Sequence, residues 1–192
     1  MRFFSKKLNK SSRGFTLVET LVAISIFTVS LLGITSVLAG SLSHTSYVKQ
    51  KMTAIYLAQE GIEYMRNMRD THVLYDSDSD FSVFSSVFNP NPPIGCVQSS
   101  PCGFISSPPP PPYLLAKCSQ ASGCKLNVDN GNYYLANPPD GGSDSGFTRK
   151  IWGRKVGSGQ DEVKIFSKVL WKQGSGEYSV TFSENLFDWI DK

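Results

Sequence analysis

The stretch Arg13-Gly14-Phe15-Thr16-Leu17-Val18-Glu19 joins a basic leader to an apolar helix. The leader, residues 1–14, carries five cations and no acid, whereas residues 20–48 carry no formally charged side chain. Glu19 is therefore the single acid at the head of a long apolar segment. A carboxylate in a membrane segment is energetically expensive, so it is a functional candidate by default. The alternative is a side chain that only reaches back to the lipid headgroups.

The apolar segment runs from Thr20 to about Ser43, which is long enough for a membrane-spanning helix. The leader cations favour a cytoplasmic N-terminus and place the rest of the chain outside the cytoplasm. The competing prediction is an ordinary signal peptide cut near residues 39–41. Such a peptide would have a shorter apolar core than the one present here.

The run GFTLVE, residues 14–19, resembles the cleavage and methylation signature of type IV prepilins and pseudopilins. The resemblance implies that prepilin peptidase removes residues 1–14, cutting after Gly14, and methylates the new amine at Phe15. It also implies that Glu19 pairs with the Phe15 amine of a neighbouring subunit. The expected partners are that peptidase, other pilin or pseudopilin subunits, membrane lipid before assembly, and an inner-membrane assembly platform.

Residues 15–70 are predicted to form one long helix, because no proline occurs before Pro90. Residues 15–44 form the membrane or filament-core half. Residues 45–70 form an amphipathic half. Its apolar stripe is predicted to consist of residues that recur at helical spacing, namely Val48, Met52, Ile55, Ala58, Ile62 and Met65. The run from Leu57 to Asp70 resembles the stem of PilV-like minor pilins.

Residues 71–125 are predicted to be rich in loops, with an acidic run at 76–80 and five consecutive prolines at 108–112. The acidic run lacks the glycine and glutamate of a calcium loop, and no metal site is predicted. Four cysteines in an exported segment favour two disulfides, with three connectivities open and local pairing preferred. A zinc site is the rival, although its pairs are usually spaced more closely. The four residues are Cys96, Cys102, Cys118 and Cys124.

Residues 126–192 are predicted to form an antiparallel sheet. Asn130-Gly131 indicates a hairpin, and further strands are expected at 147–156, 163–172 and 178–182. The amphipathic half of the helix would cover one face of the sheet. The predicted fold class is therefore α+β and pilin-like, with a long N-terminal helix packed on a C-terminal antiparallel sheet.

The charge and motif content of the chain do not indicate an enzyme. The net charge is +3, but outside the leader 14 cations face 16 acids. No nucleophile motif, phosphate-binding glycine loop or HExxH run is present, so we predict no enzymatic activity and no cofactor. A basic cluster with a tryptophan is the candidate for DNA contact, although the solvent face of a strand is also commonly basic: Arg149, Lys150, Trp152, Arg154 and Lys155.

The sequence therefore predicts a pilin-like subunit of the minor type. After assembly this subunit is expected to be part of a cell-surface filament. The first alternative is a pseudopilin of a type II secretion or DNA-uptake machine. The second is a membrane-anchored adhesin or binding module that does not polymerise. The signature at residues 14–19 is shared by pilins and pseudopilins and does not separate them.

Overall fold

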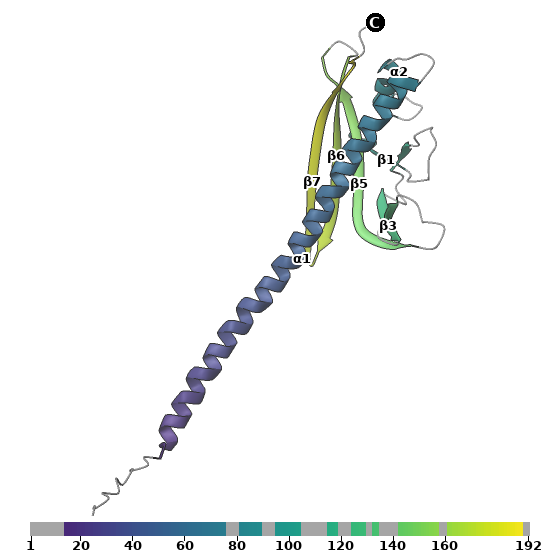
Figure 1. Ribbon diagram of the computed structural model, residues 1–192. Coiled ribbons are helices and arrows are strands. Elements are labelled where there is room, and N and C mark those ends of the chain that lie inside the picture. The colour runs from purple at the N-terminus through teal and green to yellow at the C-terminus, as the bar shows by residue number, and fades with distance from the viewer. Residues whose placement is uncertain are drawn as a thin grey trace, which may run out of the picture. The chain divides into compact units, whose positions relative to one another are not determined.

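The computed structural model describes residues 14–75, 81–89, 95–104, 115–118, 124–129, 132–134, 142–157 and 161–189 (Figure 1). The chain divides into two compact units, Met1–Ser46 and Tyr47–Lys192. The described helices and strands are α1 Leu17–Tyr75, α2 Phe81–Ser86, β1 Cys102–Phe104, β2 Leu115–Lys117, β3 Lys125–Asp129, β4 Asn132–Tyr134, β5 Ser143–Lys155, β6 Glu162–Gln173 and β7 Gly176–Phe187.

Helix α1 is continuous over 59 residues and confirms the long N-terminal helix, with an end five residues beyond the predicted one. Its serine and threonine hydroxyls donate to backbone carbonyls three or four residues earlier. Examples are Ser25 to Leu21 at 2.8 Å and Ser30 to Ile26 at 2.8 Å. Hydroxyls bonded in this way expose no unsatisfied donor, which suits an apolar environment.

The second unit is built on an antiparallel sheet, as predicted. β5, β6 and β7 form its long part, with Phe147 opposite Trp171 and Val169 opposite Val180. On its other side, β5 pairs with β3 and, at a single residue pair, with β1. The predicted hairpin is confirmed by the pairing of β3 with β4, although its turn at residues 130–131 lies outside the described residues.

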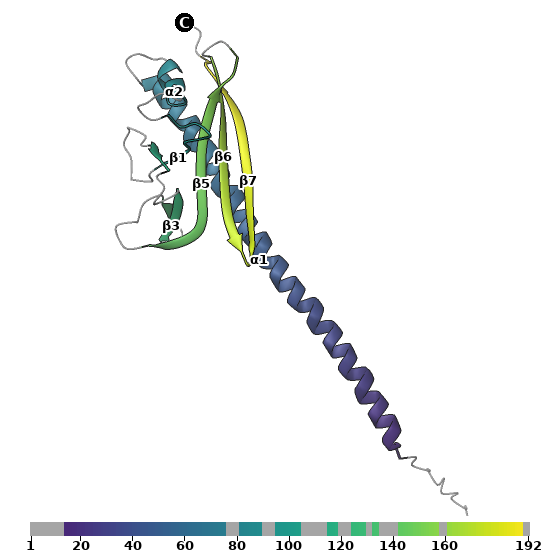
Figure 2. The same cartoon turned by 180° about the vertical axis from the view of Figure 1, so that it is seen from behind.

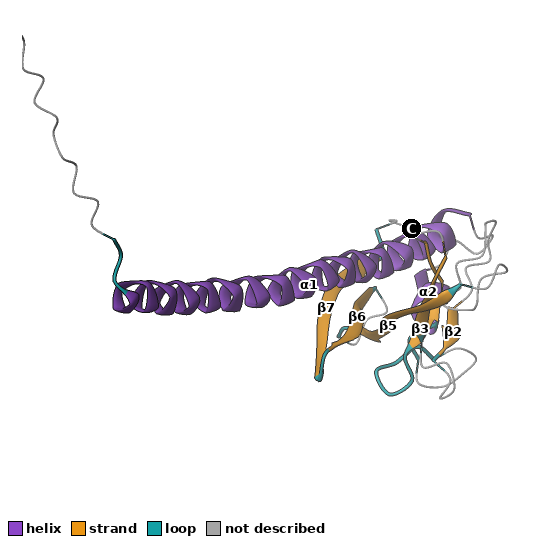
Figure 3. Ribbon diagram, turned by 90° about the horizontal axis from the view of Figure 1, so that it is seen from below, coloured by secondary structure: helices purple, strands orange, loops and turns teal. Residues whose placement is uncertain are grey.

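From Tyr47 onward, α1 covers one face of this sheet (Figure 3). The stripe that faces the sheet combines small residues, with Ala54 and Ala58 fully buried, and larger ones such as Leu57 and Met65. The prediction that Val48 and Met52 belong to this stripe was wrong, because they are 52 % and 51 % exposed. The small side chains allow the helix axis to lie close to the sheet at Ala54 and Ala58, and the larger ones fill the core further along α1.

Residues 71–125 contain more structure than predicted. Helix α2 buries Phe81 and Phe84, and the turn after it buries Phe88. These rings pack in one core cluster with Cys96, Cys102 and residues of α1 and the sheet. Apolar burial of this kind holds short elements that could not form alone. The leader up to residue 13, the acidic run 76–80 and the proline run 108–112 lie outside the described residues.

Gly61 marks the closest approach between helix and sheet. A Cβ at this position would lie 2.3 Å from the Ser167 hydroxyl oxygen and 3.3 Å from the Ile151 Cδ1 atom. Gly61→Ala is therefore expected to lower the free energy of unfolding by about 1–3 kcal/mol, although alanine favours helix by about 1 kcal/mol. Urea unfolding of the full chain in nonionic detergent measures this change.

The matched control is Gly33→Ala, where a Cβ would meet no atom within 4 Å. The Ser167 hydroxyl has no hydrogen-bond partner, so Ser167→Ala is expected to be mild and to restore part of the loss in the double variant. Equal stability of Gly61→Ala and the original chain would show that the helix and sheet do not approach so closely.

Candidate functional site

The candidate processing site lies immediately before α1. Gly14, Phe15 and Thr16 are not helical, and the helix begins at Leu17. The Thr16 hydroxyl accepts the backbone N–H of Glu19 at 3.3 Å, and the Thr16 carbonyl accepts the N–H of Thr20 at 3.2 Å. Thr16 is thus the N-cap, and Glu19 occupies the position of the acid in a capping box. The Gly14–Phe15 bond is outside the helix and accessible.

Glu19 lies in the first turn of α1, where the helix dipole favours a negative charge by about 0.3–1 kcal/mol. A new amine at Phe15 would add a positive charge at the same unfavourable end. Glu19 is the acid in the first turn, and its negative charge can offset the positive charge of that amine. The chemistry of the site therefore combines an exposed peptide bond, a capped helix start and one nearby carboxylate.

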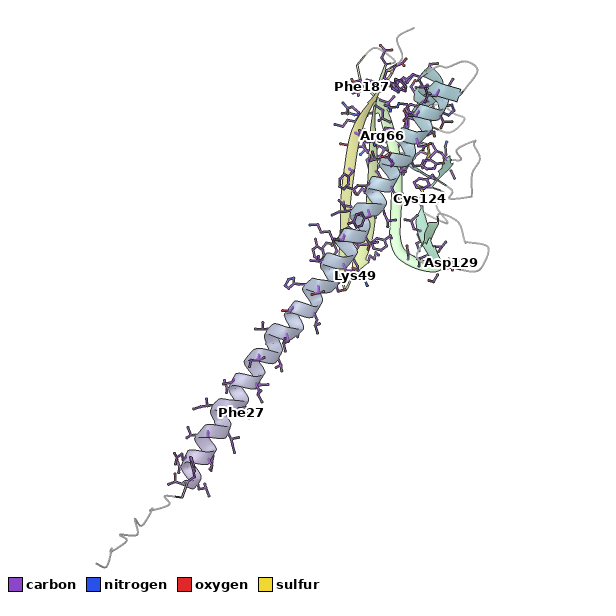
Figure 4. All side chains as sticks on the ribbon, in the orientation of Figure 1. Phe27, Lys49, Arg66, Cys124, Asp129 and Phe187 are labelled. Carbon is purple, nitrogen blue, oxygen red and sulfur yellow. A yellow bond between two sulfur atoms is a disulfide. The ribbon has the colours of Figure 1, made fainter. Side chains whose placement is uncertain are left out.

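The apolar side chains that follow Glu19 are uncovered in the single chain. Phe27, labelled in Figure 4, is 63 % exposed, and Leu32 is 70 % exposed. Among the described residues α1 is the one helix long and apolar enough to cross a membrane, with mean hydropathy 2.3 and none of that window buried. Exposed apolar surface on this scale requires lipid or other protein to cover it.

The four cysteines form two local disulfides, Cys96–Cys102 and Cys118–Cys124, each with a sequence separation of six. This is the preferred arrangement among the three that the spacing allowed. No cysteine in the described residues is free, so none remains to bind zinc. In the same part of the chain, no cluster of three or more histidine, cysteine or acidic side chains could hold a metal ion.

The structure corrects the predicted DNA-contact cluster at Arg149. This side chain is 1 % exposed and lies on the face of β5 that α1 covers. Its Nη1 atom donates to the Glu60 carboxylate at 2.6 Å and to the Leu57 carbonyl at 3.3 Å. Its guanidinium also lies 3.8 Å from the centre of the Phe104 ring. Arg149 therefore joins helix to sheet and is not available to a ligand.

Burial lowers the pKa of Arg149 from its usual value, and the Glu60 carboxylate opposes that shift. Arginine keeps its charge at any physiological pH, so the pair is an ion pair with one buried member. The sequence contains a signal for this burial. Arg149 alternates in phase with Phe147 and Ile151, and all three are buried. Its partner, 89 positions away on α1, could not be identified from the sequence.

A second ion pair that the sequence did not indicate joins α1 to β7. Arg66 donates through Nη2 to both carboxylate oxygens of Glu184, at 2.9 and 2.8 Å. The hydrogen bond to Glu184 is the main reason that the pKa of Arg66 is raised. Both side chains are partly exposed, so the pair adds little stability and chiefly fixes orientation.

The other members of the predicted cluster remain outside the core. Arg154 is exposed, and Lys150, Trp152 and Lys155 are partly exposed. Lys150, Trp152 and Arg154 alternate out of phase with the buried residues and lie on the sheet face opposite α1. The structure therefore divides the predicted cluster between two faces of the sheet.

Comparison with known families gives one match. The model of the prokaryotic N-terminal methylation motif matches residues 9–35, which include the Gly14–Phe15 bond and Glu19. No curated protein and no solved structure matches the chain. The apolar helix and the matched motif fit a membrane-anchored, single-pass, pilin-like protein.

Over the matched residues the chain is similar to type IV prepilins and pseudopilins, which carry this motif. Subunits with this motif are structural proteins and not enzymes, and the motif implies processing by prepilin peptidase and assembly with other pilins. The matched segment ends at residue 35, so it does not bear on the PilV-like resemblance, which stays a prediction.

Proposed function

We propose that this chain is a minor subunit of a type IV pilus-like filament. Prepilin peptidase cuts it after Gly14 and methylates Phe15, and an inner-membrane platform assembles it with other pilins. Before assembly the chain crosses the inner membrane once, with its N-terminus in the cytoplasm. Afterwards the first half of α1 lies in the filament core and the sheet domain at the surface.

The observation that carries this proposal is the uncovered first half of α1, whose start lies within the matched methylation motif. Lipid covers such a surface before assembly, and the same half-helix of other subunits covers it afterwards. The leader cations support the proposed orientation. A simple anchor would also need the apolar helix, but it would not need a capped start with an acid three residues after the cap.

Glu19 has a specific role in this proposal. Its carboxylate pairs with the Phe15 amine of the neighbouring subunit in a medium without water. Loss of one partner leaves the other charge buried and unpaired, which costs about 3–5 kcal/mol of free energy. Pairing therefore favours one register between subunits.

Glu19→Ala and Glu19→Gln are expected to be cut normally but to lower incorporation into filaments by roughly 100-fold or more. Quantitative immunoblots of sheared filaments and of membranes measure incorporation and leader removal in the same cells. Glu19→Asp, which keeps the charge on a shorter side chain, is expected to retain part of the incorporation. If Glu19→Ala entered filaments at the original level, the pairing role would be wrong.

A further inference from the structure

The sheet face opposite α1 carries an unusual arrangement of charge. Figure 2 views β5 and β6 from this side, where no described helix covers them. In the register of these strands Lys150 lies opposite Lys168, and Arg154 lies opposite Lys164. Two pairs of like charges thus face each other across neighbouring strands. Like charges in directly opposed positions destabilise a sheet.

Between these two cation pairs lies a pair of aromatic rings. Trp152 is opposite Phe166, and their rings stack with centroids 5.3 Å apart and an interplanar angle of 9°. The Lys164 ammonium lies 5.7 Å from the centre of the Phe166 ring. We call these six residues the basic aromatic platform: Lys150, Trp152, Arg154, Lys164, Phe166 and Lys168.

The acids beside the platform lie at its edges, where Asp144 and Glu177 line one pocket with Lys150. On β7 the residues opposite Lys164, Phe166 and Lys168 are neutral. The acids of this face stand at the strand ends, where Glu177 pairs with Lys172 at 2.9 Å and Glu162 accepts from Asn185 at 2.6 Å. Among the described residues none of the four platform cations has a carboxylate partner. An anionic ligand would relieve this repulsion.

A groove of about 460 Å³ opens beside the aromatic pair. Its lining includes Trp152, Phe166 and Arg154, with Val97 and Gln98 from the segment after α2. An apolar ring wall beside an exposed guanidinium suits a ligand that combines a planar ring with a negative charge. Nucleotides have this combination, since bases stack on aromatic side chains while phosphates meet cations.

We propose that the basic aromatic platform binds single-stranded nucleic acid. A base stacks against Trp152 in the groove, and the backbone phosphates pair with the cations on either side of the rings. A duplex keeps its bases inside its own stack and could use only the cations. An acidic polysaccharide could also pair with the cations, but its sugar rings are not planar. The observations therefore favour the single strand.

The test uses the full chain in nonionic detergent and a fluorescent oligothymidylate of about 20 nucleotides. Fluorescence anisotropy at several salt concentrations measures the affinity and its salt dependence. With four phosphates neutralised, the slope of log affinity against log salt is expected to be about −3. The double variant Lys164→Gln with Lys168→Gln should reduce this slope to about −1.4, because two phosphate contacts remain. Trp152→Ala should weaken binding by tenfold or more.

The matched control is Lys49→Gln with Lys117→Gln, which removes the same charge from exposed positions outside the platform. It is expected to bind as the original chain does. Trp152→Phe keeps an aromatic ring, so its affinity should stay within about threefold of that of the original chain. This variant replaces Trp152→Ala if the alanine variant fails to fold. Melting curves of each variant verify the fold.

Four results would overturn the proposal. They are an absence of binding, an equal loss in the control pair, equally tight binding of duplex DNA, and an unchanged affinity in Trp152→Ala with an intact fold. Polygalacturonate serves as the competing polyanion. If it bound the platform more tightly than the oligothymidylate and depended on the same lysines, the site would be assigned to an acidic polysaccharide instead.

Discussion

Gly14→Val is expected to leave the chain uncut, with residues 1–14 retained and no methylated Phe15. The side chain at this position would not disturb the chain itself, because a Cβ on Gly14 meets no atom within 4 Å and the helix begins only at Leu17. A loss of processing would therefore report recognition by the peptidase. Gly14→Ala is expected to act in the same direction.

Immunoblots of whole cells distinguish the precursor from the mature chain by mass. Gly33→Ala provides the control, because Gly33 is an equally unobstructed glycine in the apolar segment that follows the leader, and this variant should be cut normally. Normal processing of Gly14→Val would mean that the cut falls elsewhere. Cleavage near residues 39–41 would then restore the signal-peptide interpretation.

Glu60→Ala is expected to lower the free energy of unfolding by about 3 kcal/mol. The change leaves the Arg149 guanidinium buried without its counter-charge, while its Nε and Nη2 atoms already have no hydrogen-bond partner. We place the effect at the lower end of the 3–5 kcal/mol range for breaking a buried pair, because the Glu60 side chain is 46 % exposed. Urea unfolding of the full chain in nonionic detergent gives the value.

Glu63→Ala is the control for this measurement. Glu63 also lies on α1 and pairs with an arginine, Arg66, but its side chain is 66 % exposed. Removal of an exposed pair should change stability by no more than about 0.5 kcal/mol. If Glu60→Ala were as mild as Glu63→Ala, the buried pair between helix and sheet would not contribute as described.

The helix and the sheet were predictable because their signals are local. The absence of proline before Pro90 and the apolar run after Glu19 define α1, and Asn130-Gly131 with alternating strands defines the sheet. The processing signature was equally local, since it lies within six residues. Local disulfides were preferred from spacing alone, and the two observed bridges agree with that preference.

Features that depend on distant parts of the chain were not predictable in the same way. Val48 and Met52 have helical spacing, but at this end of the sheet Tyr47 and Ala54 make the contacts, so the side of α1 that faces the sheet was assigned wrongly there. Arg149 was grouped with neighbouring cations, although the strand alternation places it on the opposite face. Its partner Glu60 and the Phe104 ring come from other elements, and only tertiary structure brings them together.

The division of the basic cluster between two faces also changes which residues make up the candidate ligand site. One cation became a link between helix and sheet, while Lys150 and Arg154 gained cross-strand neighbours, Lys168 and Lys164, that the sequence alone did not associate with them. The candidate ligand site is therefore a surface of two strands, with Phe166 in place of Arg149. Register between strands was the missing information.

The central claim is that this chain is cut after Gly14 and enters a filament through its exposed stem. Intact-mass analysis of protein from sheared surface filaments tests it most directly. We expect a chain of residues 15–192 with one methyl group on the Phe15 amine. A chain that retains residues 1–14, or that stays in the membrane and is missing from the filaments, would contradict the claim.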